Sequence, residues 1–305
     1  MGVTNGPESS QIDFTLNAKT ILIKNFDFEV ALPCRIERKL RRQVFRQRDP
    51  DCSIVKRFHG FPEPQNGLGR MILETPNSSR TLYFRSNTSD KAVIGQIFRS
   101  RDYDLARFRR WSELRDFLAN QHRSGGRPLI VDAGANIGAS TAFFAIAFPT
   151  ALVVAIEPEE SNFDLLTKNS LGLNVEVMKA ALSSETGRAT VYNPGTEHWS
   201  FRTERTKSAE GVPCVTVDSL YSEFARHGVF PFIVKIDIEG GEEDVFMRNT
   251  EWVKKTPVIM IELHDWKWSK KGTSRPFLQC MSALDRDFLY SGENIFSIDN
   301  NLIAK

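Results

Sequence analysis

The chain has 305 residues, and its 40 Lys and Arg nearly balance its 38 Asp and Glu. This balance gives no overall field that would select nucleic acid or a membrane surface, and no apolar stretch is long enough to span a bilayer. The N-terminal residues 1–17 show no secretory signal, and the four cysteines form no C-x-x-C pair. We therefore expect a cytoplasmic protein with reduced thiols, no zinc site and no membrane span.

Residues 1–84 are expected to form an N-terminal α+β extension or cap. Within it, residues 35–48 carry apolar side chains at helical spacing among many basic ones, which predicts an amphipathic basic helix. Such a helix either contacts an anionic partner or lies solvated on the main domain, and the absence of interleaved aromatic residues favours the second reading. Arg70–Leu73 and Arg80–Arg85 have strand character and predict a hairpin. The main domain is placed at residues 85–305.

The central motif of the main domain is an apolar run that ends in an acid and continues into a turn of small residues, Leu129–Thr141. It predicts a buried strand, a tight loop and the start of a helix. Gly134 and Gly138 let a ligand lie on the main chain near the free N–H groups of that helix. The spacing is G-x-x-x-G, with Asn136 where a dinucleotide site has a middle glycine. Asp132, directly before the loop, suits a positively charged ligand better than phosphates.

A second strand, Ala151–Ile156, is predicted by a continuous apolar run, as is typical of a strand buried on both faces. It ends in Glu157, and a carboxylate at this position can accept charge-assisted hydrogen bonds from ribose hydroxyls. Residues 175–179 predict the third strand. Ala180 follows at its end, where the backbone and a small side chain could border an adenine ring.

Residues 212–217 are also strand-like, and Asp218 is expected to cap the helix that follows. Cys214 lies in this alternating run and is preceded by a proline, as the nucleophile of some cytosine methyltransferases is. Its place in the run favours a buried structural cysteine instead. We also expect a helix over residues 105–120.

A second group of charged residues lies in the stretch Phe232–Glu242, where an apolar strand carries Lys235 and Asp237 on the same side. Glu239 continues that side as the strand ends. Burying three charges on one sheet face is costly unless they pair or serve a ligand.

The neighbouring strand, residues 258–264, places Glu262 and His264 on one face. Both strands end at the carboxyl edge of the sheet, where open α/β folds bind ligands. We interpret Lys235 and Glu262 as mainly positioning residues, for instance through a mutual ion pair.

The other three charged or titratable residues of these two strands are expected to lie nearer the substrate: Asp237, Glu239 and His264. His264 titrates near neutral pH and is a candidate to accept a hydroxyl proton, a role that Asp237 or Glu239 could also fill. Either carboxylate would alternatively suit a divalent metal. No spacing in the sequence assigns a metal ligand, so we assign none.

Taken together, these motifs resemble the FkbM family of S-adenosylmethionine-dependent methyltransferases. The resemblance is carried, in chain order, by Val131–Gly138, Glu157-Pro158 with Asn162, Phe163 and Asn169, Lys179–Leu182, Lys235–Gly240 with Glu242, and Glu262–His264. It covers roughly Arg85 to Phe288. It implies an α/β fold of the Rossmann-like class I methyltransferase type, with a seven-stranded, mostly parallel sheet flanked by helices.

The resemblance also implies that the cofactor is S-adenosyl-L-methionine. We expect it to be bound by Asp132, Gly134, Asn136, Gly138, Glu157 and Ala180, with His264, Asp237 and Glu239 as the catalytic residues. Members of this family commonly methylate a hydroxyl oxygen, so the expected acceptor is a small molecule, a sugar or glycan, or a natural product, and not nucleic acid.

Three alternatives compete with O-methylation. An N-methyltransferase acting on adenine would be expected to show N/D-P-P-Y/F after the fourth strand, where this chain has residues 237–240, Asp-Ile-Glu-Gly. A non-catalytic S-adenosylmethionine-binding scaffold would keep the fold without turnover. An NAD-dependent oxidoreductase is disfavoured by the spacing of the glycine loop.

Overall fold

The computed structural model describes residues 67–75, 79–193 and 201–303 in full. It also gives the course of four short strands, which are β1 (Phe14–Asn17), β2 (Thr20–Ile23), β3 (Val30–Ala31) and β4 (Arg57–Phe58). The chain forms two compact units, residues 1–52 and 53–305. In the first unit, β1, β2 and β3 pair as an antiparallel sheet. The expected basic helix over residues 35–48, Cys34 and Cys52 lie outside the described residues.

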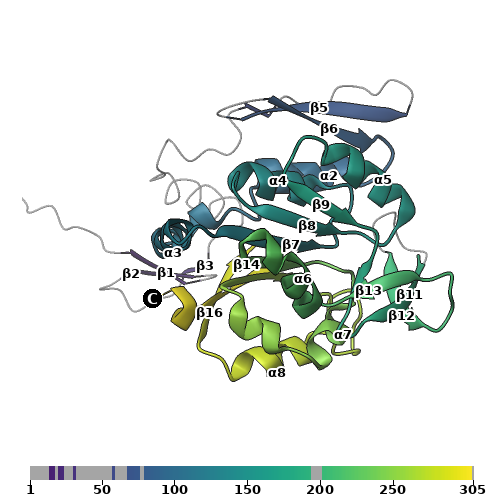
Figure 1. Cartoon of the computed structure of the whole chain (residues 1–305). Coiled ribbons are helices and arrows are strands. Elements are labelled where there is room, and N and C mark those ends of the chain that lie inside the picture. Colours follow the sequence, from purple (N-terminus) through teal and green to yellow (C-terminus); the bar gives the residue numbers. More distant parts are fainter. Residues whose placement is uncertain are drawn as a thin grey trace, which may run out of the picture. The chain divides into compact units, whose positions relative to one another are not determined.

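The second unit is built on a seven-stranded sheet with the order β16–β17–β15–β14–β7–β8–β9 (Figure 1). Its strands are β7 (Arg127–Ala133), β8 (Leu152–Ile156), β9 (Val175–Met178), β14 (Val229–Ile236), β15 (Val258–Glu262), β16 (Arg286–Ser291) and β17 (Asn294–Asp299). Only β17 runs antiparallel to its neighbours within this sheet of the described chain. On one side of the sheet β7 is followed by β8 and β9, and on the other side β14 is followed by β15, β17 and β16. This is the predicted Rossmann-like sheet, and its topological switch point lies between β7 and β14.

Helices cover both faces of this sheet, which explains why its central strands are apolar on both sides (Figure 1). One face carries α3 (Trp111–Arg123) and α4 (Ala139–Ala147), and the other carries α6 (Val217–Phe224), α7 (Glu242–Met247) and α8 (Arg275–Ser282). Helix α5 (Glu160–Asn169) follows β8. Val131, Val234 and Ile259, on three adjacent strands, are completely buried.

The predicted hairpin is formed by β5 (Leu68–Glu74) and β6 (Ser79–Arg85), and it packs within the second unit. Alternate side chains, Met71, Leu73, Leu82 and Phe84, are buried in the same core as α4. Tyr83 exchanges two backbone hydrogen bonds with the side chain of Asn169 on α5, at 2.7 and 3.0 Å. This hairpin was expected to belong to the N-terminal extension, whereas its contacts join it to α4 and α5 of the main domain.

A smaller sheet stands beside the main one and contains β10 (Ala181–Leu182), β13 (Val212–Val215), β11 (Gly187–Tyr192) and β12 (Arg202–Thr206), in that order. The predicted strand around Cys214 is β13, and this cysteine is buried. The remaining short elements are α2 (Asp90–Ile94), η1 (Gly95–Arg99), η2 (Leu105–Arg107), η3 (Ala225–His227), η4 (Glu251–Lys255) and α9 (Asn300–Ile303).

Two helix starts differ from the prediction. The N-cap of α6 is Thr216, not Asp218, because Thr216 is extended and exchanges 3.0 Å hydrogen bonds with Ser219 in a capping box. The helix expected from residue 105 begins with the short 3₁₀ turn η2, and α3 starts only at Trp111. Within the described residues, no helix combines the length and apolarity needed to cross a membrane.

Candidate functional site

A cavity of about 320 Å³ opens at the carboxyl edge of the main sheet. It lies at the switch point between β7 and β14, where ligands bind in open α/β sheets. Residues at or after the ends of β7, β8, β9, β14 and β15 contribute to its wall, and these include Gly134, Ala135, Asn136, Glu157, Ala180, Asp237, Glu239 and Glu262. The two groups of residues that the sequence singled out therefore face one cavity.

The loop after β7 is shaped by left-handed backbone at three alternate positions, Gly134 (φ 72°), Asn136 (φ 50°) and Gly138 (φ 85°). Asparagine is among the few other residues that tolerate this conformation, which explains its place between the glycines. Gly134 and Asn136 line the cavity. Gly138 does not; a Cβ there would lie 2.9 Å from Leu166, so this glycine allows α4 to pack closely on α5.

The carboxylate of Asp132 lies inside the protein and is not part of the cavity wall. One oxygen accepts hydrogen bonds from the hydroxyls of Ser140 and Thr141, at 2.7 and 2.6 Å. The other lies 3.2 Å from Nζ of Lys235. Through these contacts Asp132 ties the loop to the first turn of α4.

Lys235 is completely enclosed and joins the two halves of the site. It stands opposite Asp132 in the β14–β7 register, and it also donates to the carbonyl of Gly134 at 2.7 Å. Burial alone would lower the pKa of Lys235, but the carboxylates of Asp132 and Asp237 outweigh burial and raise it. The ion pair expected between Lys235 and Glu262 is thus replaced by a pair with Asp132.

Glu157 is buried at the end of β8 and faces the cavity. Its two oxygens accept hydrogen bonds from the backbone N–H groups of Asn136 at 2.8 Å and Glu159 at 3.0 Å. Burial raises the pKa of Glu157 to about 7, although these hydrogen bonds oppose the rise. Each oxygen keeps a lone pair for a further donor.

Asn136 adds a second acceptor, because its Oδ1 is buried and has no hydrogen-bond partner within the described residues. A buried acceptor without a partner costs free energy unless a ligand satisfies it. The cavity therefore fits a ligand that brings hydroxyl or amine donors, as the ribose and amino acid parts of S-adenosylmethionine do.

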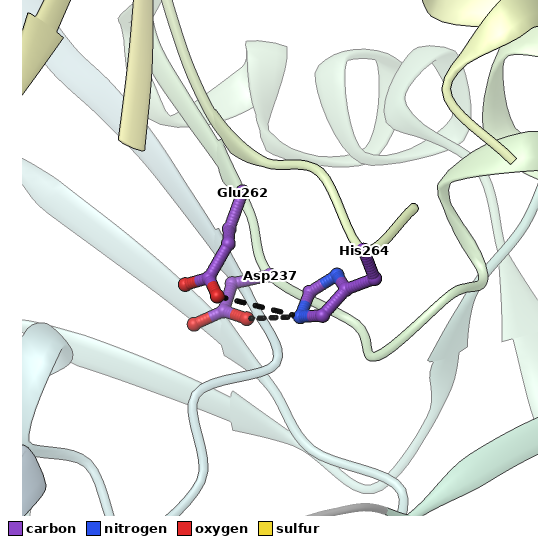
Figure 2. A group of neighbouring side chains, drawn as sticks. All are labelled: Asp237, Glu262 and His264. Atoms are coloured by element: carbon purple, nitrogen blue, oxygen red, sulfur yellow. Dashed lines mark ion pairs between the residues drawn. The ribbon is translucent and has the colours of Figure 1, made fainter. Parts of the chain in front are cut away.

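The carboxylates of Asp237 and Glu262 converge on the imidazole of His264 (Figure 2), and the carboxylate of Glu239 also lies near it. Nε2 of His264 lies 3.8 Å from Oδ1 of Asp237, 3.6 Å from Oε2 of Glu239 and 3.6 Å from Oε1 of Glu262. Its Nδ1 lies 3.0 Å from Oε1 of Glu242, at the start of α7. Only 1% of the His264 side chain is exposed.

This arrangement disfavours the expected role of His264 as a proton acceptor. Burial would lower the pKa of His264, but the hydrogen bond to Glu242 and the nearby carboxylates raise it to about 9. This rise favours the form of the imidazole that carries a proton on each nitrogen. A ring without a free lone pair cannot accept the hydroxyl proton.

Glu239 and Glu262 differ in their surroundings. Glu239 adopts a left-handed backbone (φ 58°) and pairs with Lys267 at 2.7 Å. Glu262 has no lysine or arginine partner among the described residues, and burial, aided by Asp237, raises its pKa to about 8. Glu262 was expected to be a positioning residue, but it lies in the cavity wall beside the candidate catalytic carboxylates.

Two residues of the site were missed as functional candidates. Tyr103 is buried, lines the cavity and places its hydroxyl 3.5 Å from Oδ2 of Asp237; no local pattern marks it, because only the fold brings it there. Glu242 matches the family motif, but its contact with His264 was not expected. Its position at the start of a helix, directly after Gly241, was the local signal for it. Trp266 lines the cavity, whereas Trp268 does not and packs against Arg202.

Three solved structures illustrate the similarity to known folds. An O-methyltransferase from Bacillus cereus in complex with SAH is 17% identical, with 68% of this chain and 90% of that chain covered and a TM-score of 0.35. A putative O-methyltransferase from Klebsiella pneumoniae is 13% identical, with 61% of this chain and 90% of that chain covered and a TM-score of 0.32. The fibrillarin pre-rRNA processing protein of Methanococcus jannaschii is 9% identical, with 80% of this chain and 97% of that chain covered and a TM-score of 0.35. The fold assignment rests on the strand order given above rather than on these similarities.

The comparison with protein families is more specific. No curated protein matches the sequence. The family model described as "Methyltransferase FkbM domain" matches residues 132–290, which is more than half of the chain and contains both groups of site residues. The chain therefore belongs to the FkbM methyltransferase family and is an S-adenosylmethionine-dependent methyltransferase.

Proposed function

We propose that this enzyme methylates a hydroxyl oxygen of a small molecule or glycan. The observation that carries the proposal is the row of carboxylates, Asp237, Glu239 and Glu262, in the wall of the same cavity as the Gly134 loop. S-adenosylmethionine supplies the methyl group: its sulfur–carbon bond breaks as the new carbon–oxygen bond forms, and S-adenosylhomocysteine leaves. Asp237 or Glu239 accepts the hydroxyl proton, and the cavity aligns the acceptor with the methyl group.

Cofactor binding is assigned to the opposite half of the cavity. In this proposal Glu157 accepts hydrogen bonds from the ribose hydroxyls, Asn136 accepts one from the cofactor, and Ala180 borders the adenine. Asp132 and Gly138 act indirectly, since their contacts shape the loop and the start of α4. Support comes from the position of Glu157, Asn136 and Ala180 in the cavity wall.

Binding of S-adenosylmethionine should depend on pH through Glu157. With a pKa of about 7, the side chain is mostly neutral at pH 6 and mostly ionised at pH 8. If the ionised form binds the ribose, affinity rises by about tenfold over this interval. Glu157→Gln is expected to weaken binding by about tenfold at pH 8 and to remove the pH dependence. Isothermal titration calorimetry at three pH values measures both effects.

Glu160→Gln is the matched control, because Glu160 is an exposed acid at the start of α5, three residues after Glu157, and does not line the cavity. Its affinity and pH dependence should equal those of the wild type. Equal affinity in Glu157→Gln and wild type would remove Glu157 from the ribose site.

The acceptor is expected to be uncharged or cationic near the reacting hydroxyl. Asp237, Glu239, Glu262 and Glu293 all line the cavity, and Lys235 and Lys267 are already paired with carboxylates. This excess of negative charge would repel a phosphate backbone, which argues against an RNA or DNA acceptor.

Replacing Asp237 with asparagine tests the chemical half of the site. We expect methyl transfer to fall by about 100-fold or more, since general-base catalysis contributes at least this much, while affinity for S-adenosylmethionine changes by less than about threefold. The assay follows a deuterium-labelled methyl group from the donor into a small-molecule extract, with parallel RNA and protein fractions, by mass spectrometry. Label on an oxygen of a small molecule supports the proposal. Label on a nitrogen of RNA or protein, or binding without any transfer, would contradict it in favour of an N-methyltransferase or a scaffold.

A further inference from the structure

We propose that Asp237, Glu262 and His264 bind one divalent cation, with manganese as the best probe. This inference rests on the proposed function, because it places a metal ion at the acceptor end of the same cavity. One potential ligand atom from each residue lies within 4.8 Å of those from the other two. Two ligands of one cation lie no further apart than twice the metal–ligand distance, or about 4 to 5 Å for oxygen ligands.

The orientation of His264 is the second observation. Figure 2 shows the imidazole edge carrying Nε2 turned toward the carboxylates of Asp237 and Glu262. The side chain is 99% buried, yet Nε2 has no hydrogen-bond partner among the described residues, because its carboxylate neighbours stand 3.6 to 3.8 Å away. These distances are too long for hydrogen bonds, and they leave room for an ion between the groups.

Glu242 provides the support that metal-binding histidines usually have. Its Oε1 lies 3.0 Å from Nδ1, and both residues are almost fully buried. A carboxylate on one ring nitrogen fixes the ring and directs the other nitrogen toward a metal ion. The same Oε1 accepts hydrogen bonds from the backbone N–H groups of Ile238 and Gly240, so the carboxylate is itself held in place.

The local charge also favours a cation. Four carboxylates, from Asp237, Glu239, Glu242 and Glu262, surround one imidazole. Lys267 pairs with Glu239, and Lys235 is shared between Asp132 and Asp237, so Glu242 and Glu262 have no lysine or arginine partner among the described residues. Several buried carboxylates that share one imidazole are costly, and a divalent ion would offset two of their charges, with Nε2 of His264 releasing its proton as the ion binds. One imidazole and two carboxylates suit manganese or magnesium better than ions that prefer thiolates.

The experiment measures Mn²⁺ binding to the full chain by electron paramagnetic resonance, without any acceptor. We expect one bound ion per chain, a rise in the unfolding temperature on adding Mn²⁺, and affinity at least tenfold weaker in Glu262→Gln and in Asp237→Asn. Glu293→Gln is the matched control, because it removes an exposed carboxylate from the same cavity wall but not from the cluster. Its affinity should stay within about threefold of the wild type. Circular dichroism checks that each variant is folded.

The outcomes separate this inference from the proposed function. A wild-type chain that binds S-adenosylmethionine but no Mn²⁺ up to millimolar concentrations overturns the metal site and leaves the methyltransferase proposal in place. Equal Mn²⁺ affinity in the wild type, Glu262→Gln and Asp237→Asn also overturns it, since the ion would then lie elsewhere. One Mn²⁺ lost in both variants supports the site even if no hydroxyl acceptor is found, a result that would count against O-methylation alone.

Discussion

Replacing Gly134 with alanine is expected to destabilise the protein by about 2 to 5 kcal/mol and to abolish S-adenosylmethionine binding. Gly134 has φ 72°, and a Cβ built there would lie 1.8 Å from the carbonyl oxygen of Asp237. That oxygen belongs to the backbone at the end of β14, so it cannot move aside as a flexible side chain would. The strain therefore separates the ends of β7 and β14, between which the cavity opens. Urea unfolding measures the loss in the free energy of unfolding.

Gly95→Ala is the control for this substitution. Gly95 has φ −62°, and nothing lies within 4 Å of a Cβ added there. Alanine at such a helical position should be neutral or stabilise by up to about 1 kcal/mol. If Gly134→Ala unfolds at the same urea concentration as Gly95→Ala, the close approach of the two strand ends does not constrain the loop.

Replacing Lys235 with methionine is the second large change, with an expected loss of about 3 to 5 kcal/mol in the free energy of unfolding. Methionine keeps most of the length of lysine but leaves the carboxylate of Asp132, which is 0% exposed, without a cationic partner. Removing one member of a buried pair is costly because the other charge stays buried. Chemical unfolding at pH 7 measures the effect.

Two further variants test this explanation. Asp132→Asn combined with Lys235→Met should recover part of the lost stability, because the fully buried carboxylate is then neutral and only the partly exposed Asp237 has lost its lysine. Lys254→Met removes the lysine of an exposed pair with Glu251, so it should change stability by less than about 0.5 kcal/mol. A double variant no more stable than Lys235→Met would show that the lysine acts through packing rather than through its charge.

The fold was predictable where local sequence patterns are strong. β7, β8, β14 and β15 are buried on both faces, so each is a continuous apolar run that the sequence shows directly. The start of α6 was less predictable, because Thr216 and Asp218 are both good capping residues and only the backbone angles choose between them. The docking of the hairpin β5–β6 depends on Asn169, far away in the chain, and no local pattern shows it.

The sequence allowed us to predict which residues face the cavity, but not which of them form ion pairs or hydrogen bonds with one another. The ends of parallel strands share one edge, so Glu157, Asp237 and Glu262 could be expected to face one cavity. The partner of Lys235 depends on the register between β14 and β7, whose paired residues are about 100 positions apart, and this register sets Lys235 opposite Asp132. The raised pKa of His264 likewise depends on Glu242 lying beneath the ring.

The attachment of the hairpin β5–β6 has a consequence for folding during synthesis. Tyr83 is made 86 residues before its partner Asn169, a delay of roughly 4 to 17 s at ordinary translation rates. For much of this interval the apolar face formed by Met71, Leu73, Leu82 and Phe84 lacks α4 and α5, which come later in the chain. The nascent chain therefore carries an exposed apolar hairpin until these helices are made, and such exposed surface favours aggregation during synthesis.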